Sequence, residues 1–384
     1  MRFSTLQQWL FWLDTQQVTC SAPQAFEQMR SIVQRLNLAS PRYPVITVTG
    51  TNGKGSCVAL LKSIYMAAGY QVGTFTSPHL FRFNERICFQ DQCIDDILLC
   101  EFFEKIDQAR DAVTLSYFHF SFLAALLWFQ SLKLDVVILE VGIGGRYDPT
   151  NIIDADLSII TSIDLDHCER LGYTREAISL EKAGIFRPHR PAICGDRHPP
   201  QALLNYVQSM DIPFYYRGKD FDEMSLMVIE KLSHKLSVKK EHIQTGMKQS
   251  ALPWRCQLVE KDGVKYLLDV AHNPAAIRRL AEKIRDISVS GRVFAVCGMC
   301  KDKDLVQNMK PLVDRVDGWF LATLNNVRGA SSKELGEILT QLQGKNIHCY
   351  DLVKTAFRSA RDQLQKGDLL VVFGSFFMVS DVHF

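Results

Sequence analysis

The sequence has 384 residues, of which 47% are hydrophobic, so the chain can bury a full core and has the length expected of two domains. Lys and Arg number 44 against 42 Asp and Glu, and this near balance excludes a protein that coats a polyanion such as nucleic acid. No apolar stretch reaches the ~20 residues of a membrane span, and we expect no signal peptide. These features predict a cytoplasmic protein with no nucleic-acid or membrane partner, whose eleven cysteines stay reduced.

Strand-like apolar runs alternate with helical patterns along the chain, which predicts an α/β protein with mainly parallel sheets. In the first part, strands are predicted at 45–49, 71–76, 135–141, 157–163 and 191–195, with helices at 54–69, 117–131 and 174–184. In the second part, strands are predicted at 266–271, 292–298, 318–324 and 368–375, with helices at 273–287, 303–313, 332–342 and 355–365.

A charge-dense stretch, residues 217–257, separates these two parts, and we place the domain boundary in it near Ser250. The prediction is a P-loop ATPase-like N-terminal domain, residues 1–250, with a mainly parallel sheet. A smaller Rossmann-like α/β domain, residues 251–384, would follow.

Residues 45–56 are predicted to form a buried strand, a glycine-rich loop and the start of a helix. The loop and first helical turn comprise Gly50, Thr51, Asn52, Gly53, Lys54, Gly55 and Ser56. Glycines let main-chain N–H groups turn inward and a helix N-terminus adds positive charge, so the segment is typical of a phosphate cradle. Lys54 would reach the phosphate oxygens and Ser56 would lie near Mg²⁺. The strict Walker pattern is not met, because Gly55 follows the lysine, and a plain glycine-rich turn is the alternative.

Three predicted strands lead into residues that can bind a metal. Ser77 follows one strand, Glu140 closes another, and His167 follows a third in an Asp-Leu-Asp-His sequence. Ligands of open α/β sheets bind at the carboxyl ends of strands, and Mg²⁺ prefers hard oxygen donors. We therefore expect these three side chains to converge on one crevice. Taken singly, Glu140 could be a solvated strand end and His167 a structural histidine.

Several motifs occur in a familiar order: GTNGKGS, TSPHL, LEVGIGGRYDPTN, DLDH, EKAGIF, DVAHNP, GMCKDKD and VFGSFF. With these motifs the chain closely resembles the bifunctional dihydrofolate synthase/folylpolyglutamate synthase family, a branch of the Mur-ligase superfamily. The resemblance implies a monomeric ligase that uses ATP and Mg²⁺ and leaves room for a monovalent cation. It would join L-glutamate to dihydropteroate, and to the glutamyl tails of reduced folates, through an acyl phosphate.

The resemblance also implies roles for individual residues. Residues 51–54 match the ATP loop, and the three strand-end residues match the Mg²⁺ ligands. Lys182, which the helical pattern alone would place on a surface, matches a lysine carried as an N-carboxylate. We expect Lys54, Lys182 and His272 to be catalytic. Arg255 and Asp269 match nucleotide contacts of the C-terminal domain, so the site would lie between domains. The expected substrate-binding residues are Ser116, Tyr117, Phe118, His119, Tyr147, Asp148 and Pro149.

Three stretches differ from the pattern of the family. Residues 19–28 stand where the family has its pterin loop, and His119 replaces a glutamate of the pterin pocket. The segment before LPWRCQ that contributes an asparagine to the nucleotide is not found, and Trp254 replaces a glycine. Two alternatives are therefore kept: a Mur-type ligase for a different carboxylate, and a nucleotide-binding paralogue without turnover. A P-loop GTPase is disfavoured because the sequence has no N-K-x-D guanine motif.

Overall fold

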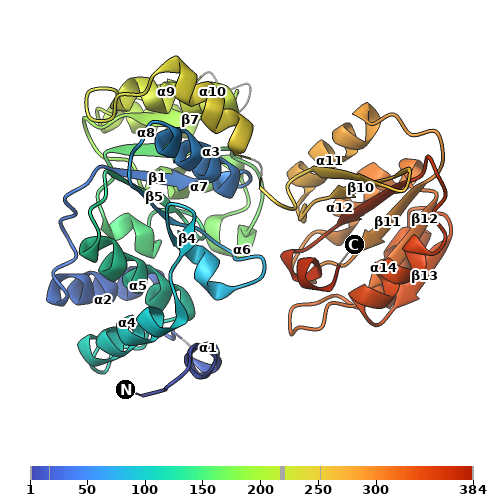
Figure 1. The fold of residues 1–384 in the computed structure, drawn as a ribbon, viewed down its shortest axis with the longest axis horizontal. Helices are drawn as coiled ribbons and strands as arrows, with labels where there is room; N and C mark the ends of the chain where they lie inside the picture. The colour runs from blue at the N-terminus through green and yellow to red at the C-terminus, as the bar shows by residue number, and fades with distance from the viewer. Residues whose placement is uncertain (1, 17, 217–220, 251, 383–384) are drawn as a thin grey trace. The chain divides into compact units, whose positions relative to one another are not determined.

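The computed structural model describes residues 2–16, 18–216, 221–250 and 252–382. The chain divides into two compact units, Met1–Ala251 and Leu252–Phe384, each built around its own sheet (Figure 1). The ends of the predicted domains at residues 1, 251 and 384 lie outside the described residues.

The first unit holds an eight-stranded sheet of order β4-β3-β2-β5-β1-β6-β7-β8. All neighbouring strands are parallel except at the β4-β3-β2 edge, where pairing is antiparallel. The central strands β1 and β5 are buried over their whole length, as expected for a sheet covered on both faces. The strands are β1 Val45–Thr49, β2 Val72–Phe75, β3 Ile87–Phe89, β4 Gln92–Cys93, β5 Val136–Glu140, β6 Leu157–Ile160, β7 Ala192–Cys194 and β8 Phe214–Tyr216.

Helices cover both faces of this sheet. Because successive side chains of a strand point to opposite faces, Val45 and Val137 join a core with α1, α2, α4 and α5, whereas Ile46 and Ile138 join a core with α3 and α9. Helix α5 is apolar nearly all round and is buried accordingly. The helices are α1 Leu6–Thr15, α2 Ala22–Arg35, α3 Lys54–Ala67, α4 Asp96–Ala109, α5 Tyr117–Ser131, α6 Cys168–Leu171, α7 Arg175–Ala183, α8 Gln201–Ser209, α9 Phe221–Leu232 and α10 Lys240–Gln249.

The polar stretch at 217–257 is mostly helical rather than an open connection between domains. Residues 217–220 lie outside the described residues, but α9 and α10 belong to the first unit and pack on α3. Helix α10 lies so close that a Cβ on Gly246 would be 2.5 Å from the Cα of Ile64. Helix α9 buries Met224, Val228 and Leu232, an i, i+4, i+8 stripe that its charged neighbours obscure in the sequence.

The second unit holds a six-stranded sheet of order β13-β12-β11-β14-β10-β9, in which only β9 is antiparallel. Its core joins α11, α12 and α13 to the central strands. The strands are β9 Gln257–Lys261, β10 Val264–Leu268, β11 Val293–Cys297, β12 Gly318–Ala322, β13 Ile347–Tyr350 and β14 Leu369–Phe373. The helices are α11 Pro274–Asp286, α12 Leu305–Met309, α13 Ser332–Gln341 and α14 Val353–Arg361.

The predicted α/β class with mainly parallel sheets is confirmed, and each predicted strand is present, most of them shorter than predicted. The helix predicted at 303–313 is instead α12 followed by a 3-10 helix, Lys310–Arg315. Pro311 lies at the start of that 3-10 helix, where its missing N–H ends the α-helical ladder.

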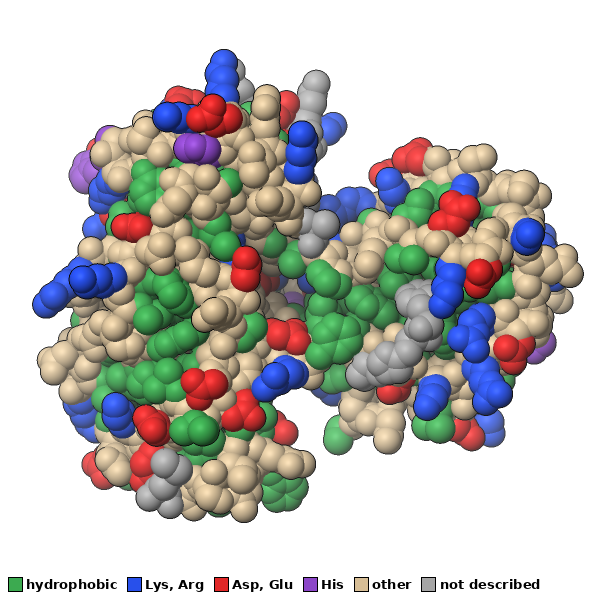
Figure 2. Space-filling model, in the orientation of Figure 1, with side chains coloured by type: hydrophobic (Ala, Val, Ile, Leu, Met, Phe, Trp, Pro, Cys, Tyr) green, Lys and Arg blue, Asp and Glu red, His purple; other side chains and the backbone are tan. Residues whose placement is uncertain are grey.

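Charged side chains of both signs are interspersed over the first unit on the face shown in Figure 2, as the near-zero net charge predicts. Among the helices of the described residues, none combines the length and hydrophobicity that a membrane crossing requires.

Candidate functional site

The glycine loop joins β1 to α3 and packs directly on the chain that leaves β6. Gly50 has a φ of 148°, and a Cβ there would be 1.9 Å from Oγ1 of Thr161. Gly53 precedes α3 in the left-handed region, with a φ of 84°. Both positions therefore require glycine, one for close approach and the other for its backbone conformation.

Hydrogen bonds from the end of β6 hold the loop in place. The Thr51 and Asn52 amides donate to the carbonyl and the Oγ of Ser162, both at 2.9 Å. The Thr51 hydroxyl donates to the carbonyl of Asp164 at 3.0 Å. Two of the amides expected to face a phosphate thus bind the protein, so the first turn of α3, whose N–H groups point out of the helix, is left as the anion-facing part. The sequence prediction missed Thr161 and Ser162 as the residues that fix the loop.

Two lysines lie next to the loop. The Lys54 ammonium donates to the Gly50 carbonyl at 2.9 Å, so this side chain folds back over the loop. Lys182, on α7, is buried rather than on the surface, with 3% of its side chain exposed. Burial, together with the positive charge of Lys54, lowers the pKa of Lys182 to about 7, although Asp166 opposes the shift. Lys182 therefore has a far more accessible neutral form than an ordinary lysine.

Ser77 and Glu140 meet beside the start of α3. The Ser77 amide donates to Oε2 of Glu140 at 3.0 Å, and the Ser77–Pro78 peptide bond is cis. Glu140 ends β5 with only 3% exposure, and a Cβ on Gly55 would be 3.6 Å from the same oxygen. A buried carboxylate facing the first turn of the loop helix has the oxygen chemistry that a divalent cation needs.

His167 follows β6 and caps the short helix α6 in the left-handed region, with a φ of 51°. In the part of the chain that the structure describes, no group of three or more His, Cys, Asp and Glu residues could hold a metal. The predicted set has only Glu140 and His167 of those types, with Ser77 as a hydroxyl ligand, so it would not form such a group. The metal role of these residues stays a prediction.

Arg86 links the predicted metal residues to the predicted substrate residues, and sequence reasoning missed it. The buried guanidinium donates from Nε to Nδ1 of His79 at 2.9 Å and lies 4.9 Å from the ring of Tyr117. Burial lowers the pKa of Arg86, which charges on Tyr117 and Glu140 oppose. Burial and Arg86 lower the pKa of His79 to about 4. The sequence feature that could have pointed to Arg86 is the charged Glu85-Arg86 pair directly before the apolar residues 87–89.

Ser116 and His119 form the capping box of α5. The Ser116 amide donates to Nδ1 of His119 at 3.0 Å, and the His119 amide donates to the Ser116 hydroxyl at 3.3 Å. Burial lowers the pKa of His119 to about 4, so the ring stays neutral and keeps its acceptor. The ring nitrogen thus performs the reciprocal helix-capping role that glutamate commonly has at this position.

The other predicted substrate residues follow β5. Asp148 is buried and accepts hydrogen bonds from the Gly142 amide at 3.0 Å and the Thr150 hydroxyl at 2.6 Å. Burial raises the pKa of Asp148, and these hydrogen bonds oppose the shift. Pro149 starts a 3-10 helix, Pro149–Ile152, that Asp148 caps. Tyr147 is 42% exposed, so it is the member of this group that is open to a ligand.

Phe118 lies against the same turn. A Cβ on Gly142 would be 2.8 Å from Cζ of Phe118, so the ring contacts the backbone that follows β5. On its other side Phe118 packs on Phe75, with ring centroids 5.5 Å apart. The structure therefore brings together the α5 and post-β5 parts of the predicted substrate set.

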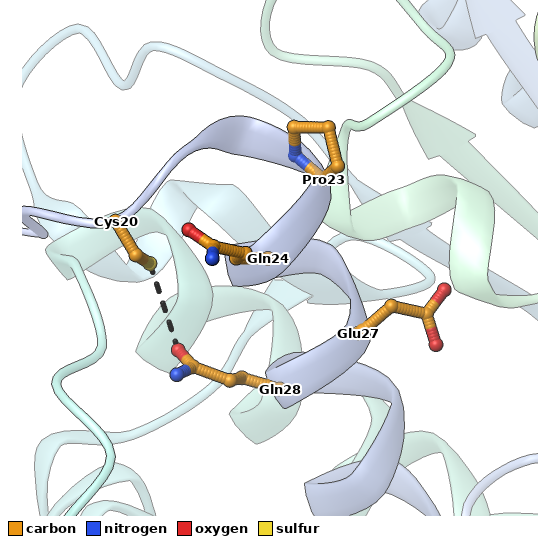
Figure 3. Close-up of a pocket in the computed structure, with 5 residues that line it drawn as sticks. All are labelled: Cys20, Pro23, Gln24, Glu27 and Gln28. Atoms are coloured by element: carbon orange, nitrogen blue, oxygen red, sulfur yellow. Dashed lines mark hydrogen bonds between the residues drawn. The ribbon is translucent and has the colours of Figure 1, made fainter.

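The stretch aligned with the pterin loop of the family forms the start of α2. The Ser21 amide donates to Oε1 of Gln24 at 3.1 Å and closes a capping box. A cavity of about 410 Å³ lies here, lined by Cys20, Pro23, Gln24, Glu27 and Gln28 (Figure 3). The Cys20 thiol donates to Oε1 of Gln28 at 3.6 Å, whereas Glu27 projects away from these side chains (Figure 3).

The second unit brings its own predicted residues together. Both carboxylate oxygens of Asp269 accept amide hydrogen bonds at 2.6 Å, one from Cys256 and one from Ala271. Phe376 neighbours both Arg255 and His272: its ring centroid is 4.8 Å from Cζ of Arg255 and 6.0 Å from the His272 ring centroid. Buried Asn308 donates to the His272 carbonyl at 3.0 Å. Phe376 and Asn308 were not predicted.

Comparisons with known proteins identify the family of the chain. The family model described as "Mur ligase middle domain" matches residues 48–195, and the one described as "Mur ligase, glutamate ligase domain" matches residues 254–376. The dihydrofolate synthase/folylpolyglutamate synthase of Escherichia coli K12 is 36% identical over 407 residues, covering 99% of this chain and 95% of the relative.

Solved structures are similar over nearly the whole chain. FolC of E. coli in complex with DHPP and ADP has a TM-score of 0.92 at 36% identity, covering 98% of this chain and 96% of that one. A bifunctional folylpolyglutamate synthase/dihydrofolate synthase with Mn, AMPPNP and L-glutamate bound has a TM-score of 0.90, also at 36% identity, covering 98% and 97%. The chain therefore belongs to the dihydrofolate synthase/folylpolyglutamate synthase family of Mur ligases.

Proposed function

We propose that the protein is an ATP-dependent ligase that joins L-glutamate to dihydropteroate and to the glutamyl tails of folates. The observation that carries the proposal is the grouping of Lys54, Glu140 and buried Lys182 around the start of α3. Relatives of the same fold were solved with ADP and DHPP, and with Mn, AMPPNP and L-glutamate. ATP and a divalent cation are accordingly part of the proposal.

The first step would be transfer of the γ-phosphoryl group to the carboxylate of the pterin-bearing acid. A carboxylate is a poor electrophile, and the acyl phosphate supplies a leaving group for attack by the glutamate amine. Such catalysis depends on positioning and on neutralising charge. In this chain, the first turn of α3, held in place by the rest of the loop, would bind the phosphates, and the Lys54 ammonium would neutralise them.

Ser77, Glu140 and His167 would hold Mg²⁺, because Glu140 offers a buried carboxylate and Ser77 is already bonded to it. When bound, the cation neutralises the negative charge of the phosphates. Lys182 would carry an N-carboxylate. The neutral amine attacks the carbon of CO₂ and loses one proton, so a buried cation becomes an anion.

The unit Met1–Ala251 would supply this ATP and metal chemistry, and the unit Leu252–Phe384 would act as the glutamate-ligase domain. Arg255 and Asp269 would contact the nucleotide, with His272 in a catalytic role. The contact of Arg255 and His272 with one ring, Phe376, supports their acting together. The monomeric state, the monovalent cation and the cytoplasmic location stay predictions; eleven free cysteines are consistent with a reducing compartment.

A Mur-type ligase for a different carboxylate is the second candidate. It is favoured by Nδ1 of His119, which accepts a hydrogen bond from Ser116 and caps α5. It is also favoured by the start of α2, where Ser21 and Gln24 cap a helix in place of the family's pterin loop. A nucleotide-binding paralogue without turnover is disfavoured by the retained lysines and Glu140.

One assay separates these functions. The purified protein is incubated with ATP, Mg²⁺ and L-glutamate, with either dihydropteroate or a reduced folate, and both ADP and the conjugate are measured. ADP and conjugate with dihydropteroate alone would support the synthase step, and formation with both acids would support both activities. If the protein binds nucleotide but forms no ADP with either acid present, the proposed substrates are refuted.

A further inference from the structure

Two cysteines face each other on the hairpin at the edge of the first sheet. Cys88 on β3 pairs directly with Cys93 on β4, and their sulfur atoms are 3.0 Å apart. The Ile94 amide donates to the Ile87 carbonyl at 3.0 Å, so the neighbouring pair is the hydrogen-bonded one. Cys88 and Cys93 therefore occupy a non-hydrogen-bonded position of the antiparallel ladder.

That position suits a covalent bond between the two sulfurs. Directly opposite residues at such positions have Cα atoms about 4.5 Å apart, and disulfides span about 4.4–6.8 Å between Cα atoms. The side chains already point to the same face of the hairpin, because paired residues of a ladder share a face. The two strands need no change of register to form the bond.

The two thiols also differ in access to solvent. Cys93 is exposed and Cys88 is partly buried. The Cys88 sulfur has a second partner, the Glu85 carbonyl, at 3.4 Å. An exposed thiol backed by a partner at contact distance is the arrangement of an attacking and a resolving cysteine.

We propose that Cys88 and Cys93 form a modification site for hydrogen peroxide that closes reversibly to an intrachain disulfide. The Cys93 thiolate attacks one peroxide oxygen, the O–O bond breaks, and after protonation a sulfenic acid and one water result. The Cys88 sulfur then attacks the Cys93 sulfur, displacing hydroxide and losing its proton, which gives the disulfide and a second water. The two thiols together lose two electrons and two protons, and the peroxide gains them.

The modification site is independent of the proposed ligase function, but it lies on a segment that reaches the candidate site. Asp91, at the hairpin turn, pairs with Lys62 of α3 at 2.9 Å. At the base of the hairpin, the Glu85 carboxylate accepts a hydrogen bond from the Leu80 amide at 2.7 Å and so holds the loop that follows Ser77. An exposed disulfide at this edge would be accessible to reductants, as reversibility requires.

The test is peptide mapping of the full-length protein after exposure to hydrogen peroxide. Free thiols are alkylated after denaturation, and trypsin then releases the peptide 87–105, which contains Cys88, Cys93 and Cys100. The expected result is loss of two hydrogen masses in this peptide, with one alkylated site at Cys100, and full recovery of three alkylated sites after dithiothreitol.

Two variants make the test specific. Cys93→Ser should abolish the two-hydrogen loss, while Cys349→Ser, which removes another exposed cysteine, should leave it unchanged. The reduced Cys93→Ser protein should keep the wild-type circular dichroism spectrum and ADP formation, which excludes misfolding. The proposal is overturned if wild-type Cys88 and Cys93 both stay alkylatable at peroxide levels that oxidise Cys349, or if they become sulfinic acids without a crosslink.

Discussion

Replacing Lys182 with alanine should remove the N-carboxylate that the ligase chemistry requires. Lys182 is 3% exposed, and burial, with Lys54 as a second cause, lowers its pKa from 10.5 to about 7. Only the neutral amine reacts with CO₂, so this shift determines how readily the modification forms.

The size of the effect follows from the two pKa values. At about pH 8 an amine with a pKa near 7 is roughly nine-tenths neutral, whereas an ordinary lysine is neutral in roughly one molecule in 300. The neutral fraction of Lys182 should therefore be about 300-fold larger than that of a solvent-exposed lysine under the same conditions. The modified fraction should rise with pH around 7, because the folded-state pKa of the amine lies there.

The modification can be read directly by ¹³C NMR of protein equilibrated with labelled bicarbonate. Wild type and Lys62→Ala should both show the carbamate signal, since Lys62 is a partly buried lysine already paired with Asp91. Lys182→Ala should lose the signal and most ADP formation, and short carboxylic acids should restore part of the activity. Full activity of Lys182→Ala without added acid, or an unchanged carbamate signal in that variant, would refute the role of Lys182.

Three further substitutions test other parts of the site. Gly50→Ala should cost about 3 kcal/mol of unfolding free energy and abolish ATP binding, because its Cβ would overlap Oγ1 of Thr161, just after β6. The control, Gly69→Ala, is also at positive φ but in open space. It should cost only about 1 kcal/mol and keep ATP binding. Denaturant titration and calorimetry would measure both, and equal losses would contradict the packing argument. His119→Gln keeps an acceptor but cannot titrate. Since the pKa of His119 falls from 6.5 to about 4 on folding, wild type should lose up to about 3 kcal/mol of stability as pH drops through that window, and His119→Gln should lose correspondingly less. Identical pH profiles would exclude this histidine from the acid sensitivity. Glu140→Gln should lower ATP turnover about 100-fold and weaken its Mg²⁺ dependence, and wild-type Mg²⁺ dependence would remove Glu140 from the metal site.

The strands and the glycine loop were predictable because buried parallel strands are continuous apolar runs that end in glycine or a polar residue. Helix α1 was not predicted, although its capping box of Thr5 and Gln8 is visible as a T-x-x-Q pattern. Helices α9 and α10 were hidden by their charge density. Strands β9 and β13 lie at sheet edges, where partial exposure removes the apolar run.

The meeting of Ser77 and Glu140 was predictable because both residues stand at the carboxyl ends of strands of one sheet. The site was not predictable where a residue acts through a distant partner. The Ser162 hydroxyl that holds the loop looks like any strand residue until β6 is placed beside β1. Likewise, the helical pattern alone predicts that Lys182 is exposed, and its burial becomes visible only once α7 is packed in the structure.

The contact between Gly246 and Ile64 has a mechanical consequence. With no side chain between them, α10 and α3 meet backbone to backbone, so neither helix can slide along the other without separating. The helix that begins at the glycine loop is thereby tied to Gln249, the last residue of α10 and two positions before the end of the first unit. A larger residue at 246 would force α10 away from α3, because its Cβ would lie 2.5 Å from the Cα of Ile64.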